Sequence, residues 1–201
     1  FFVAFGVAQM IYGPWADQAG RKKPLITGLI IFIIASLGCH FAQSVGSLQV
    51  WRFLQGLGAA VVMVVPRAII RDMLTRNQAT RLMALIMLVI SVSPMLAPLA
   101  GSAIIAFGSW RGIFLVLAIA AVLSLLMTIF LQPETLRPED SVPVHMGSLL
   151  KGARGLLTDP MFMGLTFIGG FGMASFLVFI ASASFVYSGQ YGLTPTQFSL
   201  A

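Results

Sequence analysis

The stretch GPWADQAGRKKPL, residues 13–25, decides how this chain is organised, because it sets one acid, three bases and two glycines between two apolar runs. No charged residue precedes Asp17, and none follows Lys23 until Arg52. A membrane span needs about 17–25 mainly apolar residues, so both flanks suit hydrocarbon and only the stretch between them suits water. Residues 13–25 therefore predict a tight cytoplasmic turn between two membrane spans.

The composition narrows the class of protein further. The chain has 201 residues, 58% of them hydrophobic and 9% charged, which leaves too little polar surface for a soluble fold. We expect a polytopic membrane protein in contact with a lipid bilayer. Lys and Arg form short clusters between apolar runs, without the continuous basic face that nucleic-acid binding needs. One cysteine, Cys39, and two distant histidines, His40 and His145, offer no intrachain disulfide and no metal-ligand cluster.

Apolar runs and basic loops together predict the topology. We expect spans at residues 1–16, 25–42, 48–66, 82–107, 113–131 and 161–187, and the start of another at 197–201. Ten of the twelve Lys and Arg lie in the alternate loops 17–23, 67–81 and 132–160, which are therefore expected to be cytoplasmic. Span 1–16 has no basic n-region and is not a signal peptide. Entered from outside, it calls for an earlier span, so we expect the chain to be a fragment.

The inner segment 132–160 differs from the rest in composition. It contains three prolines and little periodicity before about residue 144, and is interpreted as a linker between two membrane bundles, at 1–131 and 161–201. Within it, apolar residues recur at helical spacing from Met146 to Leu157, while Lys151 and Arg154 project elsewhere. This pattern is typical of a short amphipathic helix on the inner membrane surface. A solvated linker helix fits the pattern equally well.

Arg52 is the only charged residue within a predicted span. On a helix it shares one stripe with Gln55 and Gly56, whereas larger apolar side chains cover the other faces. An ionisable residue inside a membrane suggests function by default, so the stripe predicts a cavity or the bundle interior. The alternative is that Arg52, about four residues from the outer edge of the span, snorkels to the surface.

A second unusual stretch runs from residue 93 to residue 101. Pro94 and Pro98 lie one turn apart and remove backbone hydrogen bonds, which permits a bend, while Ser93, Ala97 and Gly101 form a stripe of small residues. An ordinary kinked packing helix would show the same pattern.

These residues match signatures of a known family. The positions Gly13, Ala16, Asp17, Gly20, Arg21 and Lys22 resemble the Gly-x-Leu-Ala-Asp-Arg-x-Gly-Arg-Lys signature of major facilitator superfamily transporters. Arg52, Gln55 and Gly56 are similar to its fourth-helix signature, and Ser93, Ala97, Pro98 and Gly101 to its antiporter signature. With Pro133–Leu136 and Tyr191–Pro195, the chain resembles the bicyclomycin and chloramphenicol resistance branch of the twelve-span drug:proton antiporters. Trp15 and Gln18 depart from the first signature, and Gln18 removes one expected charge near Asp17.

The resemblance implies an all-α major facilitator fold, of which the chain would cover helices 2–7 and the start of helix 8. It implies a monomeric exporter in the bacterial inner membrane that exchanges protons for small hydrophobic drugs and uses no cofactor besides the proton gradient. Arg52, Gln55 and Gly56 would line the cavity and couple to protonation. The cytoplasmic gate would comprise Gly13, Asp17, Gly20, Arg21, Lys22, Arg71 and Asp72. The helix with Ser93, Pro94, Ala97, Pro98 and Gly101 would seal the two halves against leak.

Other functions remain open at this stage. A proton-coupled carrier of a native metabolite and a transport-inactive scaffold or sensor would share most of these features. An enzyme is not expected, because the spans offer serines without a neighbouring base. All six acids lie in the inner loops or at their helix ends, so we expect the acid that couples transport to protons in a preceding helix, close enough to Arg52 for that charge to shape its pKa.

Overall fold

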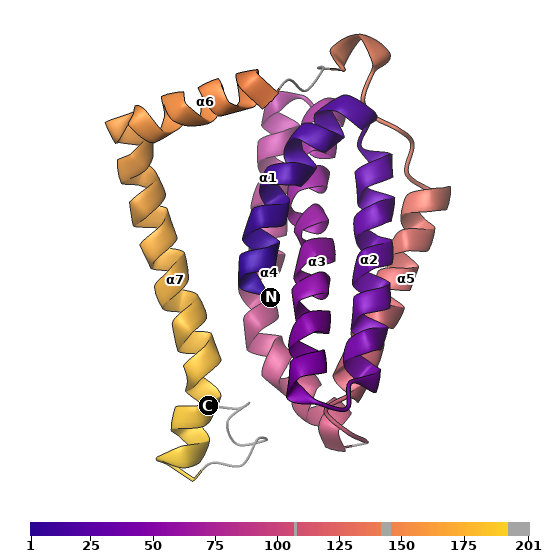
Figure 1. Ribbon diagram of the computed structural model, residues 1–201, viewed down its shortest axis with the longest axis vertical. Helices are drawn as coiled ribbons and strands as arrows, with labels where there is room; N and C mark the ends of the chain where they lie inside the picture. The colour runs from indigo at the N-terminus through magenta and orange to yellow at the C-terminus, as the bar shows by residue number, and fades with distance from the viewer. Residues whose placement is uncertain (107, 142–145, 193–201) are drawn as a thin grey trace. The chain divides into compact units, whose positions relative to one another are not determined.

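The computed structural model describes residues 1–106, 108–141 and 146–192, and their ordered elements are all helices (Figure 1). This confirms the predicted all-α fold. The elements are α1 (Phe2–Ala19), α2 (Lys22–Phe41), α3 (Val45–Met73), α4 (Arg76–Ala106), α5 (Gly112–Phe130), a short 3-10 turn at Pro138–Asp140, α6 (Met146–Thr158) and α7 (Pro160–Gly189).

Four helices among the described residues are long and apolar enough to cross a membrane, namely α2, α3, α5 and the Pro160–Ile180 part of α7. Arg76–Pro94 and Leu96–Ala106 of α4 meet at a bend of 48° and make a fifth if they are one span. The predicted first span is not among these helices. Its helix α1 is less apolar, because polar residues such as Gln9 and Asp17 are among its 18 residues. The predicted start of a span at 197–201 lies outside the described residues.

The predicted cytoplasmic loops are mostly helical, which corrects the expected boundaries. Helix α1 continues to Ala19 and α2 begins at Lys22, so Gly20 and Arg21 alone separate them. Likewise, only Leu74 and Thr75 lie between α3 and α4. At 1.5 Å per residue, the 29 residues of α3 extend about 43 Å, beyond a hydrocarbon core of roughly 30 Å. Charged residues can therefore lie in a helix and still reach water.

The chain forms two compact units. In the first, α3 packs against α1 and α2, and α2 packs against α5 (Figure 1). The second contains α6 and α7, and α4 contributes residues to both units. The core of the first unit consists of small or β-branched side chains together with Leu and Tyr, namely Ala8, Tyr12, Ala16, Leu25, Leu29, Ala60, Val61 and Val65.

Close approach of two backbones fixes the packing of α2 on α3. A Cβ atom at Gly58 would lie 2.5 Å from the backbone nitrogen of Phe32 and 2.6 Å from the carbonyl oxygen of Gly28. Only glycine fits where backbone atoms come this near. The polar side chains of the second half of α2 and the first half of α3 are thereby brought into direct contact.

Candidate functional site

The turn between α1 and α2 depends on Gly20. Its φ of 93° lies in a region that side chains rarely adopt. A Cβ atom at this position would also lie 2.5 Å from the carboxylate oxygen Oε2 of Glu134. Glycine is required here for its backbone conformation and for the approach of Glu134.

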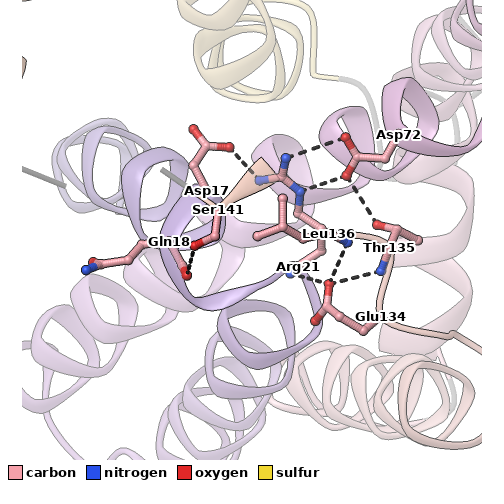
Figure 2. Close-up of polar contacts among 8 residues, drawn as sticks. All are labelled: Asp17, Gln18, Arg21, Asp72, Glu134, Thr135, Leu136 and Ser141. Atoms are coloured by element: carbon pink, nitrogen blue, oxygen red, sulfur yellow. Dashed lines mark hydrogen bonds and ion pairs between the residues drawn. The ribbon is translucent and has the colours of Figure 1, made fainter. Parts of the chain in front are cut away.

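Arg21, the second residue of this turn, joins the ends of α1 and α3 (Figure 2). Its Nη1 donates to Asp17, one turn earlier in the chain, and its Nε donates to Oδ2 of Asp72 at 2.8 Å. The Arg21 side chain is only 8% exposed, whereas that of Asp17 is 55% exposed. Asp72 also accepts a hydrogen bond from Thr135 Oγ1 at 3.2 Å. The guanidinium is therefore fixed, and one of its two acids remains open to further partners.

Opposite charges keep this arginine ionised. Burial lowers the pKa of Arg21, but the hydrogen bonds and charges of Asp72 and Asp17 outweigh it, so the net pKa is raised. Arg21, Asp17 and Asp72 form one hydrogen-bonded group of side chains, the Arg21 cluster.

Glu134 is a fourth member of this cluster that the sequence interpretation placed only in the linker. Its carboxylate accepts hydrogen bonds from the backbone nitrogens of Arg21 at 2.8 Å and Lys22 at 3.1 Å. It also accepts from the nitrogens of Thr135 and Leu136 (Figure 2). Burial raises the pKa of Glu134, yet these four donors lower it overall. The sequence offered two signals for Glu134, its place directly after a span and its membership of the family-like stretch Pro133–Leu136, but neither indicated its partners.

The remaining gate candidates have different surroundings. Gly13 lies inside α1 rather than in a turn, and a Cβ there would meet no described atom within 4 Å. Lys22 donates from Nζ to the carbonyl oxygen of Ile129 at 2.8 Å. Arg71 lines a polar cavity of about 300 Å³ beside the Arg21 cluster, together with Asp72, Thr135, Leu136, Arg137 and Asp140.

Arg52 belongs to a chain of polar groups that runs into the bundle. Its Nη1 donates to Oε1 of Gln55 at 2.6 Å, and Nε2 of Gln55 donates to Oγ of Ser36 at 2.7 Å. Gln55 and Ser36 are completely buried. The Arg52 guanidinium also lies 4.6 Å from the ring centre of Phe1 and 5.8 Å from that of Phe114, distances at which cation–π attraction operates.

Close contacts also surround the third residue of this stripe. Gly56 is buried where α3 meets the beginning of α1, and a Cβ atom at this position would lie closest to the carbonyl oxygen of Phe1. The structure thus brings Arg52, Gln55 and Gly56 together. It places them far from the Arg21 cluster, because the twenty residues of α3 between Arg52 and Asp72 extend about 30 Å.

The antiporter-like residues all lie on α4. Ser93, Pro94, Ala97, Pro98 and Gly101 follow one another along this helix, and its 48° bend falls between Pro94 and Leu96. The bend agrees with the loss of backbone hydrogen bonds at the two prolines. Ser93 Oγ donates to the carbonyl oxygen of Val89 at 2.8 Å, and a Cβ at Gly101 would meet no described atom within 4 Å.

Comparison with known proteins shows a match along the whole chain. Residues 1–201 match the Major Facilitator Superfamily. The chain is 36% identical over 200 residues to YdgK of Bacillus subtilis, an uncharacterized MFS-type transporter, covering 98% of this chain and 50% of that protein. It is 30% identical over 197 residues to a bicyclomycin resistance protein homolog of Haemophilus influenzae, covering 97% and 50%.

A third relative belongs to the multidrug resistance proteins. MdtM of Escherichia coli K12 is 28% identical over 163 residues, which cover 81% of this chain and 40% of that protein. The chain spans about half the length of the curated relatives it matches.

Proposed function

Because this chain belongs to the Major Facilitator Superfamily, a family of multi-pass membrane transporters and not of enzymes, we propose that it acts in a proton-coupled exporter of small hydrophobic drugs. The names of its relatives support the drug class: one is a bicyclomycin resistance protein homolog and another a multidrug resistance protein. Chloramphenicol-like and bicyclomycin-like compounds are the substrates we propose to test first. We place the protein in the bacterial inner membrane as a monomer.

The Arg21 cluster is the observation that carries this proposal. A transporter needs contacts that differ between its two states, because a ligand or a proton gradient acts only through such differences. In the cluster, Arg21 is held firmly by Asp72 while Asp17 stays half exposed. A half-exposed carboxylate paired with a fixed guanidinium can accept further hydrogen bonds from a facing helix terminus in one state and lose them in the other. We assign the cluster to a cytoplasmic gate.

Three further parts have assigned roles in this proposal. Residues 1–131 belong to a first helical bundle, 132–160 link it to a second, and 161–201 begin that second bundle. Arg52 faces the proposed substrate cavity, and the buried residues Gln55 and Gly56 lie behind it, where Gln55 orients the Arg52 guanidinium. The bent helix α4 seals the two bundles against each other through its small residues.

The proton itself requires a titratable group in the cavity. Every acid of this chain lies at a helix end or outside the spans, namely Asp17, Asp72, Glu134, Glu139, Asp140 and Asp159. Relatives of this chain are about twice as long. We therefore propose that the coupling acid lies outside these 201 residues and is held near Arg52.

The test measures transport in liposomes by the purified protein that includes both these 201 residues and the proposed coupling acid. A pH gradient across the bilayer is expected to drive movement of chloramphenicol, with a matching proton flux reported by a trapped pH dye. Movement of a metabolite but no drug would show a metabolite carrier, and movement of neither would show a scaffold or sensor. Drug-induced proton release by the 201-residue chain alone in detergent would contradict the placement of the acid and point to Asp17 or Asp72.

A further inference from the structure

Helix α2 begins without a cap of its own. Arg21 at the cap position makes no capping hydrogen bond from its side chain, and the first turn of α2 contains no acid. The first nitrogens of a helix need partners, and a negative charge is favourable beside them. Glu134, 113 residues later in the chain, supplies both, because its two carboxylate oxygens accept from Arg21 N and Lys22 N.

The same end of the bundle carries a reciprocal contact. Lys22, the first residue of α2, donates from Nζ to the carbonyl oxygen of Ile129 in the last turn of α5. A cation there satisfies a carbonyl at a helix C-terminus and complements the helix dipole. Lys22 of α2 therefore caps the end of α5, and Glu134, in the segment that follows α5, caps the start of α2.

Hydrogen bonds also join the opposite ends of the same two helices. Arg111 precedes α5 and donates from Nη2 to the carbonyl oxygen of Ala42, the residue that closes α2, at 3.1 Å. His40, near the end of α2, lies with Nδ1 3.0 Å from the carbonyl oxygen of Arg111. Because a carbonyl oxygen only accepts, His40 donates from Nδ1. Arg111 thus caps the end of α2, and His40 adds a second hydrogen bond between the same two ends.

We infer that Glu134 is a positioning residue, which fixes the start of α2 and with it Arg21, and that the hydrogen bonds at both ends make α2 and α5 one rigid pair. Thr135, the next residue, donates a hydrogen bond to Asp72. The beginning of the segment after α5 therefore contacts Arg21 through Glu134 and Asp72 through Thr135. A displacement of this segment moves Glu134 and with it the start of α2, so that Arg21 loses its hydrogen bond to Asp72. The capping stands on the contacts alone, whereas its effect on a gate rests on the proposed function.

The test compares Glu134→Gln with Glu139→Gln. Both remove one negative charge from the same segment, but Glu139 is 75% exposed and its contact is an ion pair with Arg137 at 3.8 Å. Hydrogen exchange is measured at the amides of Arg21 and Lys22, and drug transport is measured in liposomes. Glu134→Gln is expected to speed exchange at both amides by about tenfold or more, since bonds to a charged acceptor are the strong ones. It is expected to slow transport, while Glu139→Gln changes neither.

A conservative variant separates positioning from general damage. Glu134→Asp keeps the carboxylate and is expected to restore most of the amide protection and transport. Unchanged exchange in Glu134→Gln would overturn the capping. Faster exchange with normal transport would overturn the effect on the gate. If the wild-type protein transports nothing, the proposed function fails, and exchange at Arg21 and Lys22 still decides the capping.

Discussion

At the scale of single residues, the hydrogen-bonded chain from the half-buried Arg52 to the buried Gln55 and Ser36 shows how the bundle accommodates one charge. Gln55 accepts a hydrogen bond from Arg52 and donates one to Ser36. Ser36 Oγ in turn donates to the carbonyl oxygen of Phe32 at 2.7 Å. Both polar atoms of the Gln55 side-chain amide, Oε1 and Nε2, thereby have a hydrogen-bond partner, as a buried polar side chain requires. The hydrogen bond to Gln55 and the contact with the Phe1 ring hold the Arg52 guanidinium in one orientation in this structure.

A directional role for Arg52 predicts that Lys cannot replace it. Lys keeps the charge but lacks the planar fork that meets Gln55 Oε1 while stacking on Phe1, so Arg52→Lys is expected to reduce proton-driven drug transport by about tenfold or more. The exposed Arg81→Lys serves as the control. Full activity with both Lys and Gln at position 52 would remove this residue from the mechanism.

Ser36 is expected to contribute to stability through the same chain. Ser36→Ala leaves Nε2 of the buried Gln55 without its acceptor, at a cost of about 1–3 kcal/mol, and thermal unfolding in detergent measures it. Ser124→Ala is the matched control, because Ser124 makes the same bond to the carbonyl four residues earlier but is exposed. Equal unfolding temperatures for the two variants would contradict this interpretation.

The sequence could predict some of these contacts and not others. Arg52 and Gln55 lie three residues apart on one helix, so periodicity alone placed them on one stripe. Ser36 and Glu134 reach their partners across 19 and 113 residues, and no local pattern carries that information. The Asp17–Arg21 pair is local, whereas Asp72 joined the gate candidates only through the family resemblance.

At the scale of elements, long apolar runs predicted where helices lie, but not where they end. The expected loops 17–23 and 67–81 assumed that charged residues interrupt a helix. Charge has only modest effects on helix propensity, and the helices continue through Asp17 and Arg71. A glycine with a positive φ ends α1 instead.

Helix α6 carries a prediction that the sequence left open between two environments. Its exposed leucines Leu149, Leu150, Leu156 and Leu157 share one side, and Lys151 and Arg154 lie outside that side. It turns away from α7 at Asp159, which caps the start of α7 (Figure 1). If α7 spans the bilayer, α6 runs along the bilayer surface. The leucines then contact acyl chains, and Lys151 and Arg154 contact anionic headgroups.

Fluorescence quenching in vesicles separates the two environments. A dye is attached to Leu150→Cys or to Gly155→Cys, about 140° apart around the helix, in a Cys39→Ala background. In vesicles containing phosphatidylglycerol, lipid-borne nitroxide should quench the dye at position 150 and aqueous iodide the dye at 155. Equal quenching by iodide at both positions would show a solvated linker helix.

At the scale of the whole molecule, the clustering of Lys and Arg in alternate loops predicts the orientation in the membrane. Lys22 and the Arg21 cluster belong to the side predicted to be cytoplasmic, and Ser44 and Ser109 to the outer side. Residue 145, also predicted to be inside, lies outside the described residues.

Single-cysteine labelling tests this orientation. In a Cys39→Ala background, an impermeant thiol reagent on intact cells is expected to label cysteine at positions 44, 109 and 190, and to reach position 145 only after the cells are opened. The positive-inside rule is the physical reason. Labelling at position 145 but not at position 44 would reverse the topology.

The most direct test of the central claim, that the Arg21 cluster is a transporter gate, is the Asp17→Asn variant in liposomes. Asn keeps the size of the side chain and removes the charge beside Arg21, so it should alter the balance between the two states rather than the substrate site. Drug transport is expected to fall by about tenfold or more with substrate affinity within about threefold of wild type, while the control Glu139→Gln matches wild type in both. Normal transport by Asp17→Asn would make Asp17 a simple structural residue and would contradict the gate.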